Sequence, residues 1–248
     1  KEFVAPESLV EEEQEEITFK VRPLPEQAKT FGQWSNWFTL QSENPELVNV
    51  PADFADAYEY AYARGINVEK YNLMWSDDTE HNYHKRVIVP LYWKRQLIGS
   101  TARTFTDYIK PKYYSDYEAN YVFNTDMQTP EKKFVIVVEG PFDAMSIDGV
   151  AIMSNECSEV QADIIDSLGK EVIVVPDADR AGMKLVNQAI EYGWSVSFPI
   201  WQREGAKICK DVSEAVRMYG KLFVLKSILS GRESSKLKIE LKKKKVFA

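Results

Sequence analysis

FVIVVEGPFDAMSIDG, residues 134–149, joins a short apolar run to a segment of helical character. The first five residues are almost continuously apolar, which is typical of a strand buried on both faces of a sheet. The segment that follows, PFDAMSIDG, is expected to be a helix. The stretch therefore predicts a β-strand that leads directly into an α-helix.

The same alternation continues toward the C-terminus. Further strands are expected at 151–155, 171–177 and 195–201, and further helices at 158–169, 180–193 and 211–220. Strands that alternate with helices at this spacing indicate βα units. This half of the chain therefore predicts a mostly parallel sheet in a three-layer α/β arrangement.

Acidic residues follow the ends of the expected strands. Glu139 and Asp143 follow the first strand, Asp177 and Asp179 follow the third, and Asp211 precedes the last helix. Ligands of such sheets collect at the carboxyl ends of the strands, so these side chains are expected to converge at one edge.

Each acid also has a structural alternative. Asp179 and Asp211 could cap helices, and Glu139 could pair with a lysine. Gathered carboxylates repel one another unless a cation lies among them, and Mg²⁺ or Mn²⁺ suits oxygen ligands. The set therefore favours a metal site for phosphoryl chemistry.

Charge is distributed unevenly along a chain whose net charge is −7. Residues 1–16 carry seven acids and one lysine, as solvating tails do, whereas KLKIELKKKK (236–245) carries six lysines and one glutamate. The lysine-rich ending is either a solvated tail or a segment that docks a helicase or holds DNA.

The first half of the chain has a different pattern of expected elements. Residues 31–76 are expected to be mainly helical, and 86–105 to form a hairpin with KRQ at its turn. The stretch 85–113 carries seven Lys or Arg, one acid and several aromatic residues. It suits a groove for single-stranded nucleic acid or nucleotides, and equally a strand pair with an outward basic face.

The two cysteines have no CxxC spacing, and no apolar run or signal peptide predicts a membrane segment. A reducing, cytoplasmic location is the expectation, in the host cell if the protein is viral.

Two motifs together resemble the TOPRIM domain of bacterial-type DNA primases, type IA and type II topoisomerases and some nucleases. They are VVEGPFD (137–143) and VPDADRAG (175–182), whose Glu139 and Asp177 lie 38 positions apart. The DADRAG form is most similar to DnaG-type primases. The resemblance implies an α/β fold with a TOPRIM-type, mostly parallel sheet flanked by helices, preceded by a smaller α+β subdomain and followed by a short helical tail.

Upstream segments extend this resemblance to about residues 60–220. RVIVPLYWKRQLIGSTART (86–104), IKPKYYS (109–115) and ARGINVEKYN (63–72) are similar to elements of the primase core. The chain departs from the family where Cys209 and Lys210 precede Asp211, since relatives often have a pair of acids there. The expected divisions are an acidic tail or linker (1–30), an α+β subdomain (31–125), the TOPRIM domain (126–220) and a helical, lysine-rich tail (221–248).

The resemblance implies a DNA primase core that synthesises short RNA primers on single-stranded DNA by metal-dependent nucleotidyl transfer. Its implied partners are template, ribonucleoside triphosphates and a replicative helicase, with no membrane. The compact size is more like tailed-phage primases. No zinc module is present in these residues, and the start at Lys1 fits its removal or its presence on another chain. A TOPRIM-type nuclease, or a nucleotide- or helicase-binding remnant, is the alternative.

The implied site contains one to three Mg²⁺ or Mn²⁺ ions. Glu139, Asp177 and Asp179 would be catalytic and bind metal, with Asp143 and Asp211 supporting, and Glu139 would assist deprotonation of the attacking hydroxyl. The expected nucleotide- or template-binding residues are Arg103, Lys112, Arg180, Lys184, Gly140 and Gly182.

Overall fold

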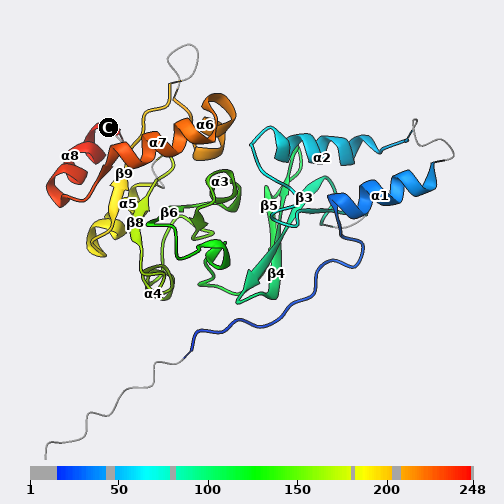
Figure 1. The fold of residues 1–248 in the computed structure, drawn as a ribbon, viewed down its shortest axis with the longest axis horizontal. Helices are drawn as coiled ribbons and strands as arrows, with labels where there is room; N and C mark the ends of the chain where they lie inside the picture. Colours follow the sequence, from blue (N-terminus) through cyan, green and yellow to red (C-terminus); the bar gives the residue numbers. More distant parts are fainter. Residues whose placement is uncertain (1–15, 43–47, 79–81, 180–181, 203–207, 247–248) are drawn as a thin grey trace, which may run out of the picture.

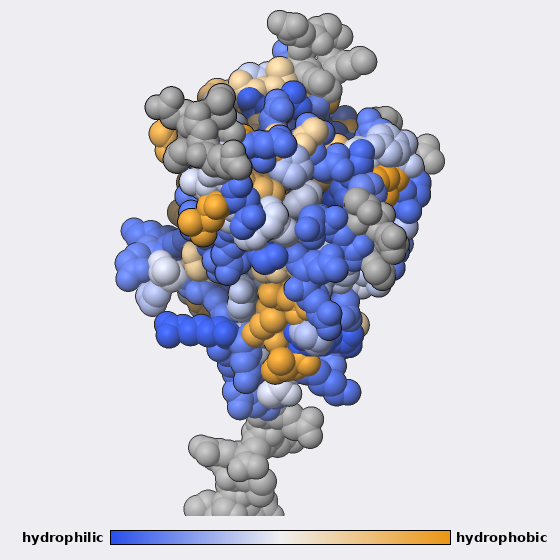
Figure 2. Space-filling view, turned by 90° about the vertical axis from the view of Figure 1, so that its right-hand side faces the viewer, coloured by the Kyte–Doolittle hydropathy of each residue, from blue (hydrophilic) through white to orange (hydrophobic). Residues whose placement is uncertain are grey.

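A computed structural model describes residues 16–42, 48–78, 82–179, 182–202 and 208–246. Two five-stranded sheets lie side by side, each with its own helices (Figure 1). Seen from the end that carries the first sheet and its helices, the surface is mainly hydrophilic with a few compact hydrophobic areas (Figure 2). Among the described helices, none has the length and apolar character needed to cross a bilayer.

The first sheet is entirely antiparallel, and its strands lie in chain order. It contains β1 (Lys29–Thr30), β2 (Met74–Trp75), β3 (Arg86–Trp93), β4 (Gln96–Thr104) and β5 (Tyr113–Asp116). Helices α1 (Phe31–Gln41) and α2 (Ala52–Tyr62) accompany it.

The expected hairpin is confirmed as β3 and β4, with Lys94 and Arg95 at its turn. Both turn residues have positive φ, 48° and 67°, which matches the twist of a two-residue hairpin turn. The backbone N–H groups of both donate to the Asp126 carboxylate, at 3.1 and 2.8 Å. A short 3₁₀ helix, η1 (Thr125–Met127), therefore anchors the turn.

The second sheet has the order β10-β9-β8-β6-β7. Its strands are β6 (Phe134–Val138), β7 (Val150–Ala151), β8 (Glu171–Val174), β9 (Ser195–Ser197) and β10 (Arg232–Glu233). Strands β6 to β9 are parallel and β10 is antiparallel. The predicted mostly parallel sheet is confirmed.

Alternate residues of β6 and β8 serve two different cores, which produces the three layers. Val135 and Val137 pack with α4 (Glu159–Asp166), α5 (Gly182–Glu191) and α8 (Lys236–Val246). Ile136 and Val138 pack with α3 (Pro141–Ile147), α6 (Val212–Tyr219) and α7 (Lys221–Gly231). The second of these cores continues into the first sheet and includes Trp34 and Phe54.

Two segments that were expected to be tails pack against the folded body. Phe19, in the expected linker, makes edge-to-face contacts with Trp93 and Tyr121. In 221–248, β10 extends the second sheet, and Ile228 and Ile239 are buried. The expected helical character of this segment is present, and the segment packs on the body because its apolar positions have partners that only the assembled sheet provides.

Asp148 joins three parts of the fold. It ends α3 in the left-handed conformation, and its carboxylate accepts hydrogen bonds from Lys70 Nζ, Tyr71 Oη and Lys221 Nζ at 2.6, 2.5 and 2.6 Å. Lys70 and Tyr71 belong to the segment after α2, whereas Lys221 begins α7. Burial acts to raise the pKa of Asp148, but the bonds from Lys221, Lys70 and Tyr71 hold it well below its usual range.

Substituting Asp148→Asn should lower the free energy of unfolding by about 1–3 kcal/mol at pH 7, because charge-assisted hydrogen bonds are lost while Asn still suits the left-handed position. The depressed pKa stabilises the fold above the unfolded-state value of about 3.9, and this contribution disappears as pH falls through the folded-state pKa. Urea denaturation should therefore show a difference between variant and parent that shrinks below about pH 4. Asp56→Asn, at an exposed position of α2, serves as the control; an equal loss there would contradict the assignment.

Candidate active site

The pairing of β6 with β8 brings the first two acids together. Val137 pairs with Val174, so Glu139 and Asp177 both leave the carboxyl end of the sheet at neighbouring positions. The Asp177 backbone N–H donates to Glu139 Oε1 at 3.3 Å. The expected juxtaposition of these two strand ends is present in the structure.

Asp143 and Asp211 join the same edge through two helices. Asp143 lies in the first turn of α3, is 6% exposed, and accepts the Ser213 backbone N–H at 2.8 Å. Asp211 is the N-cap of α6 and accepts the Glu214 backbone N–H at 2.8 Å. The capping alternative for Asp211 is therefore confirmed, and the cap holds its carboxylate near Asp143.

Asp179 ends the loop after β8. Its Oδ1 accepts the Gly182 backbone N–H at 3.3 Å, and its Oδ2 lies 3.3 Å from Lys210 Nζ. The Ala178 backbone N–H donates to the Lys210 carbonyl at 3.0 Å, which ties this loop to the segment before α6.

The pKa values of these acids are shifted because the acids lie close together. Burial, followed by the charges of Asp143 and Glu139, raises the pKa of Asp177 to about 8. Burial and the neighbouring Asp179 and Asp143 raise the pKa of Glu139, and burial with Asp211 raises that of Asp143. Protein cations offset this repulsion only in part.

The chemistry of this set fits a hard divalent cation. Its donors are carboxylate oxygens, whose mutual repulsion an ion would relieve. Within the described residues, no three His, Cys, Asp or Glu side chains stand close enough to hold one ion together. Mg²⁺ commonly binds through one or two carboxylates and completes its shell with water and substrate phosphate. One or two of Glu139, Asp177 and Asp179 therefore suffice as candidate ligands for each ion.

Cations surround the acidic group. Lys210, which directly precedes Asp211, was not predicted as a site residue. Its hydrogen bond to Asp179 is the main cause that raises the pKa of Lys210. Arg64 and Arg217, also not predicted, line a cavity of about 350 Å³ together with Lys210 and Asp211. Arg64 belongs to ARGINVEKYN (63–72), for which the sequence predicts no site role, and no sequence pattern marks Arg217. They are brought together because the turn at Gly65, after α2, runs close to Val216 of α6.

The two predicted cations of the first sheet lie beside the acids. Arg103, 8% exposed, donates from Nη1 to Tyr113 Oη at 2.7 Å, and its guanidinium lies 5.2 Å from the Phe142 ring centre. Lys112 is exposed on one side, and partial burial of its amine, together with the nearby Arg103 and Lys210, lowers its pKa. Arg86 is buried and donates to the Lys112 carbonyl at 2.9 Å, so this basic stretch is not simply an outward face.

The remaining predicted binding residues differ in how they lie relative to the acids. Lys184 is exposed on α5 and forms an ion pair with Glu156. Arg180 lies outside the described residues. A Cβ at Gly140 would lie 3.3 Å from Asp143 Oδ2, and one at Gly182 would lie 2.4 Å from the Asp177 carbonyl oxygen. The backbone therefore passes close to the acids at both glycines, most tightly at Gly182.

Gly182→Ala should lower the free energy of unfolding by about 1–3 kcal/mol, because the new Cβ would collide with backbone rather than a mobile side chain. It should also reduce stabilisation by Mg²⁺, since the loop that carries Asp177 and Asp179 must move. Urea titration with and without Mg²⁺ measures both effects. Gly32→Ala in α1 is the matched control, because its Cβ would meet only the end of the Glu69 side chain. A loss as large for Gly32→Ala would contradict the prediction.

Mg²⁺ should raise the thermal unfolding midpoint, and the increase should grow from about pH 6 to pH 8.5. Because the folded-state pKa of Asp177 is raised, the metal-free fold loses stability as pH rises through about 8, and an ion then replaces the proton. Thermal melts at one MgCl₂ concentration, compared with NaCl of equal ionic strength, test this. The pH dependence should be weaker in Asp177→Asn; an identical profile there would remove Asp177 from the site.

Known proteins resemble this chain in sequence and in fold. Residues 136–216 match the Toprim-like family. The DNA primase of Aquifex aeolicus is 25% identical over 156 residues, which cover 55% of this chain and 30% of that protein. The chain thus spans less than a third of that curated relative.

Solved structures share the fold. A DnaG primase catalytic domain bound to single-stranded DNA matches with a TM-score of 0.56 and 17% identity, over 81% of this chain and 78% of that one. The RNA polymerase domain of Mycobacterium tuberculosis DnaG, in complex with a DNA duplex bearing a 6-nucleotide overhang, matches with a TM-score of 0.59 and 16% identity. The match covers 85% of this chain and 81% of that one.

Proposed function

With a Toprim-like domain at 136–216 and the fold of a DnaG catalytic core as premises, we propose that this chain is the catalytic core of a DNA primase. It would join ribonucleotides on a single-stranded DNA template. The observation that carries the proposal is the meeting of two groups at one junction. Asp143 and Asp211, whose charges act on Asp177, lie there close to Lys112, and Asp143 also lies close to Arg103.

The acids supply metal ligands and a proton acceptor. Glu139, Asp177 and Asp179 would hold Mg²⁺ or Mn²⁺, with Asp143 and Asp211 supporting. When bound, the ion supplies charge that stabilises the transferring phosphoryl group and the leaving pyrophosphate. Because burial raises the pKa of Glu139, its carboxylate accepts a proton more readily, as removal of the proton of the attacking 3′-hydroxyl requires.

The cations orient the anionic substrates. Lys112 is exposed and near the acids, so it suits a triphosphate or template phosphate as a point charge. Arg103 is held between Tyr113, Tyr60 and Phe142, so it supplies a fixed positive charge. Among the described side chains, Arg64 Nε and Arg103 Nε are buried without a hydrogen-bond partner. Lys210 balances Asp179 until an ion and substrate bind.

The proposal extends to the partners. Single-stranded DNA is the template, ribonucleoside triphosphates are the substrates, and a replicative helicase is the partner, as in a tailed-phage system. The lysine-rich α8, whose Ile239 packs into the core that contains α4 and α5, presents Lys236 and Lys244 outward as one candidate contact for helicase or DNA.

Glu139→Gln and Asp177→Asn should each reduce primer synthesis by on the order of 10²–10³, because each removes a carboxylate that would hold the ion stabilising the reacting phosphate. The assay combines the chain, single-stranded DNA, labelled ribonucleotides and Mg²⁺, and circular dichroism verifies folding. Asp163→Asn, exposed on α4, is the matched control and should retain activity.

The products of this assay also separate the competing functions. New short RNA supports the primase, and shortened template would identify a metal-dependent nuclease instead. If neither new RNA nor shortened template is formed, the chain is a binding remnant. Full primer synthesis by either acid variant would overturn the site assignment.

A further inference from the structure

Two tyrosines on α2 form an exposed, ordered pair of rings. Tyr58 and Tyr62 lie one helical turn apart, with ring centres separated by 6.4 Å and planes within 12° of each other. They are 44% and 71% exposed. Tyr58 packs one edge on Phe31, at 5.7 Å between ring centres. The Tyr62 ring packs much less against the core, so a large ring at this position contributes little to core stability.

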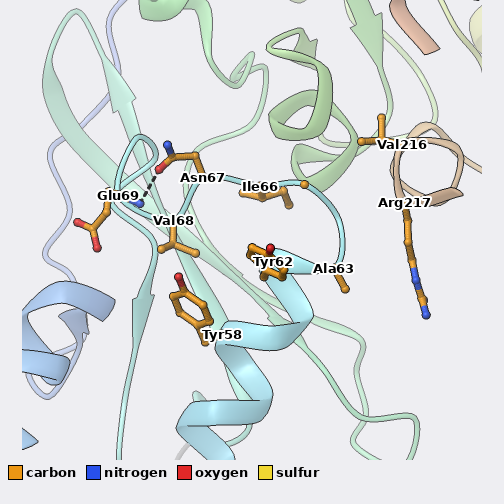
Figure 3. Close-up of a pocket in the computed structure, with 10 residues that line it drawn as sticks. Tyr58, Tyr62, Ala63, Ile66, Asn67, Val68, Glu69, Val216 and Arg217 are labelled. Carbon is orange, nitrogen blue, oxygen red and sulfur yellow. Dashed lines mark hydrogen bonds between the residues drawn. The ribbon is translucent and has the colours of Figure 1, made fainter. Parts of the chain in front are cut away.

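The pair borders a cavity of about 670 Å³. Both rings project from α2 toward the segment Ile66–Glu69, and α6 supplies Val216 and Arg217 on the other side (Figure 3). Gly65 makes this arrangement possible. Its φ is +67°, and a Cβ there would lie 3.2 Å from Val216 Cγ1. The chain can therefore turn sharply after α2 and run close to α6.

This cavity is connected to the candidate active site through one residue. Arg217 lines both the tyrosine cavity and the smaller cavity that contains Lys210 and Asp211. Arg64, which stacks on Tyr60 at 3.6 Å from its ring centre, lines the smaller cavity. A strand leaving the acidic residues would meet Arg217 first and the tyrosine rings next.

We propose that Tyr58 and Tyr62 form a stacking platform for a nucleobase of single-stranded nucleic acid. Arg217 neutralises a phosphate on the path to the acids, and the Tyr62 ring offers its exposed face to the base. Stacking of this kind tolerates any base, since every base has a π-face, and it suits template that must pass through regardless of sequence. The inference deepens the proposed function and rests on it for the identity of the strand.

The test measures binding of the full chain to fluorescein-labelled oligo(dT) by anisotropy, without ribonucleotides. Tyr62→Leu should weaken binding roughly 5-fold to 100-fold, because Leu keeps apolar bulk but has no ring face. Tyr62→Phe should bind like the parent. Tyr192→Leu, which removes a partly exposed ring at the end of α5 and away from α2, is the control and should bind normally. Thermal melts verify the fold of each variant.

Salt dependence and abasic DNA separate stacking from general attraction. Arg217→Gln should reduce the slope of log affinity against log salt by about 0.7, the value for one phosphate contact on a single strand, while Tyr62→Leu leaves the slope unchanged. Replacing the bases by abasic sites should weaken DNA binding by the parent protein and should change DNA binding by Tyr62→Leu much less. A parent-like affinity in Tyr62→Leu, or equal base dependence in both proteins, would overturn the platform.

These results are independent of primer synthesis. If the chain makes no primer yet Tyr62→Leu loses base-dependent binding, the platform stands and the primase proposal falls. If primers are made while Tyr62→Leu binds like the parent, the platform falls and the primase proposal stands.

Discussion

The parallel pairing of β6 with β8 is the constraint on which the rest of this structure depends. With Val137 opposite Val174, the two strands end level with each other, and Glu139 and Asp177 have no alternative to being neighbours. Backbone hydrogen bonds in the sheet fix this register, and the two buried faces make a slip costly because it would exchange the two cores. The sheet hydrogen bonds and the two cores hold the acids together despite their mutual repulsion.

That repulsion has a use. Burial and neighbouring charges raise the pKa values of Glu139, Asp143 and Asp177, so the fold is under electrostatic strain where it could hold an ion. The strain is offset elsewhere by packing, since the core beneath α3 and α6 continues into the first sheet. Carboxyl groups that repel one another until a cation arrives form a site prepared for one.

The junction of the two sheets determines what surrounds this acidic edge. Asp148 ties α3 to the segment after α2 and to α7, and Arg103 lies among rings from three elements. This junction puts Lys112 beside the acids and Arg217 between two cavities. The cationic and aromatic surroundings thus belong to neither sheet alone.

The sequence by itself determined the parallel sheet, the hairpin and the convergence of the acids. Each rests on a local pattern, such as the apolar run 134–138 or the acid that follows it, and parallel strands carry their ends to one edge in any fold of this type. Only the tertiary structure decided that Lys210 pairs with Asp179, that Arg86 is buried, and that 221–246 completes the second sheet. These features depend on contacts between residues far apart in the chain. The period of the sequence reports which side of an element is buried, but not which distant element covers it.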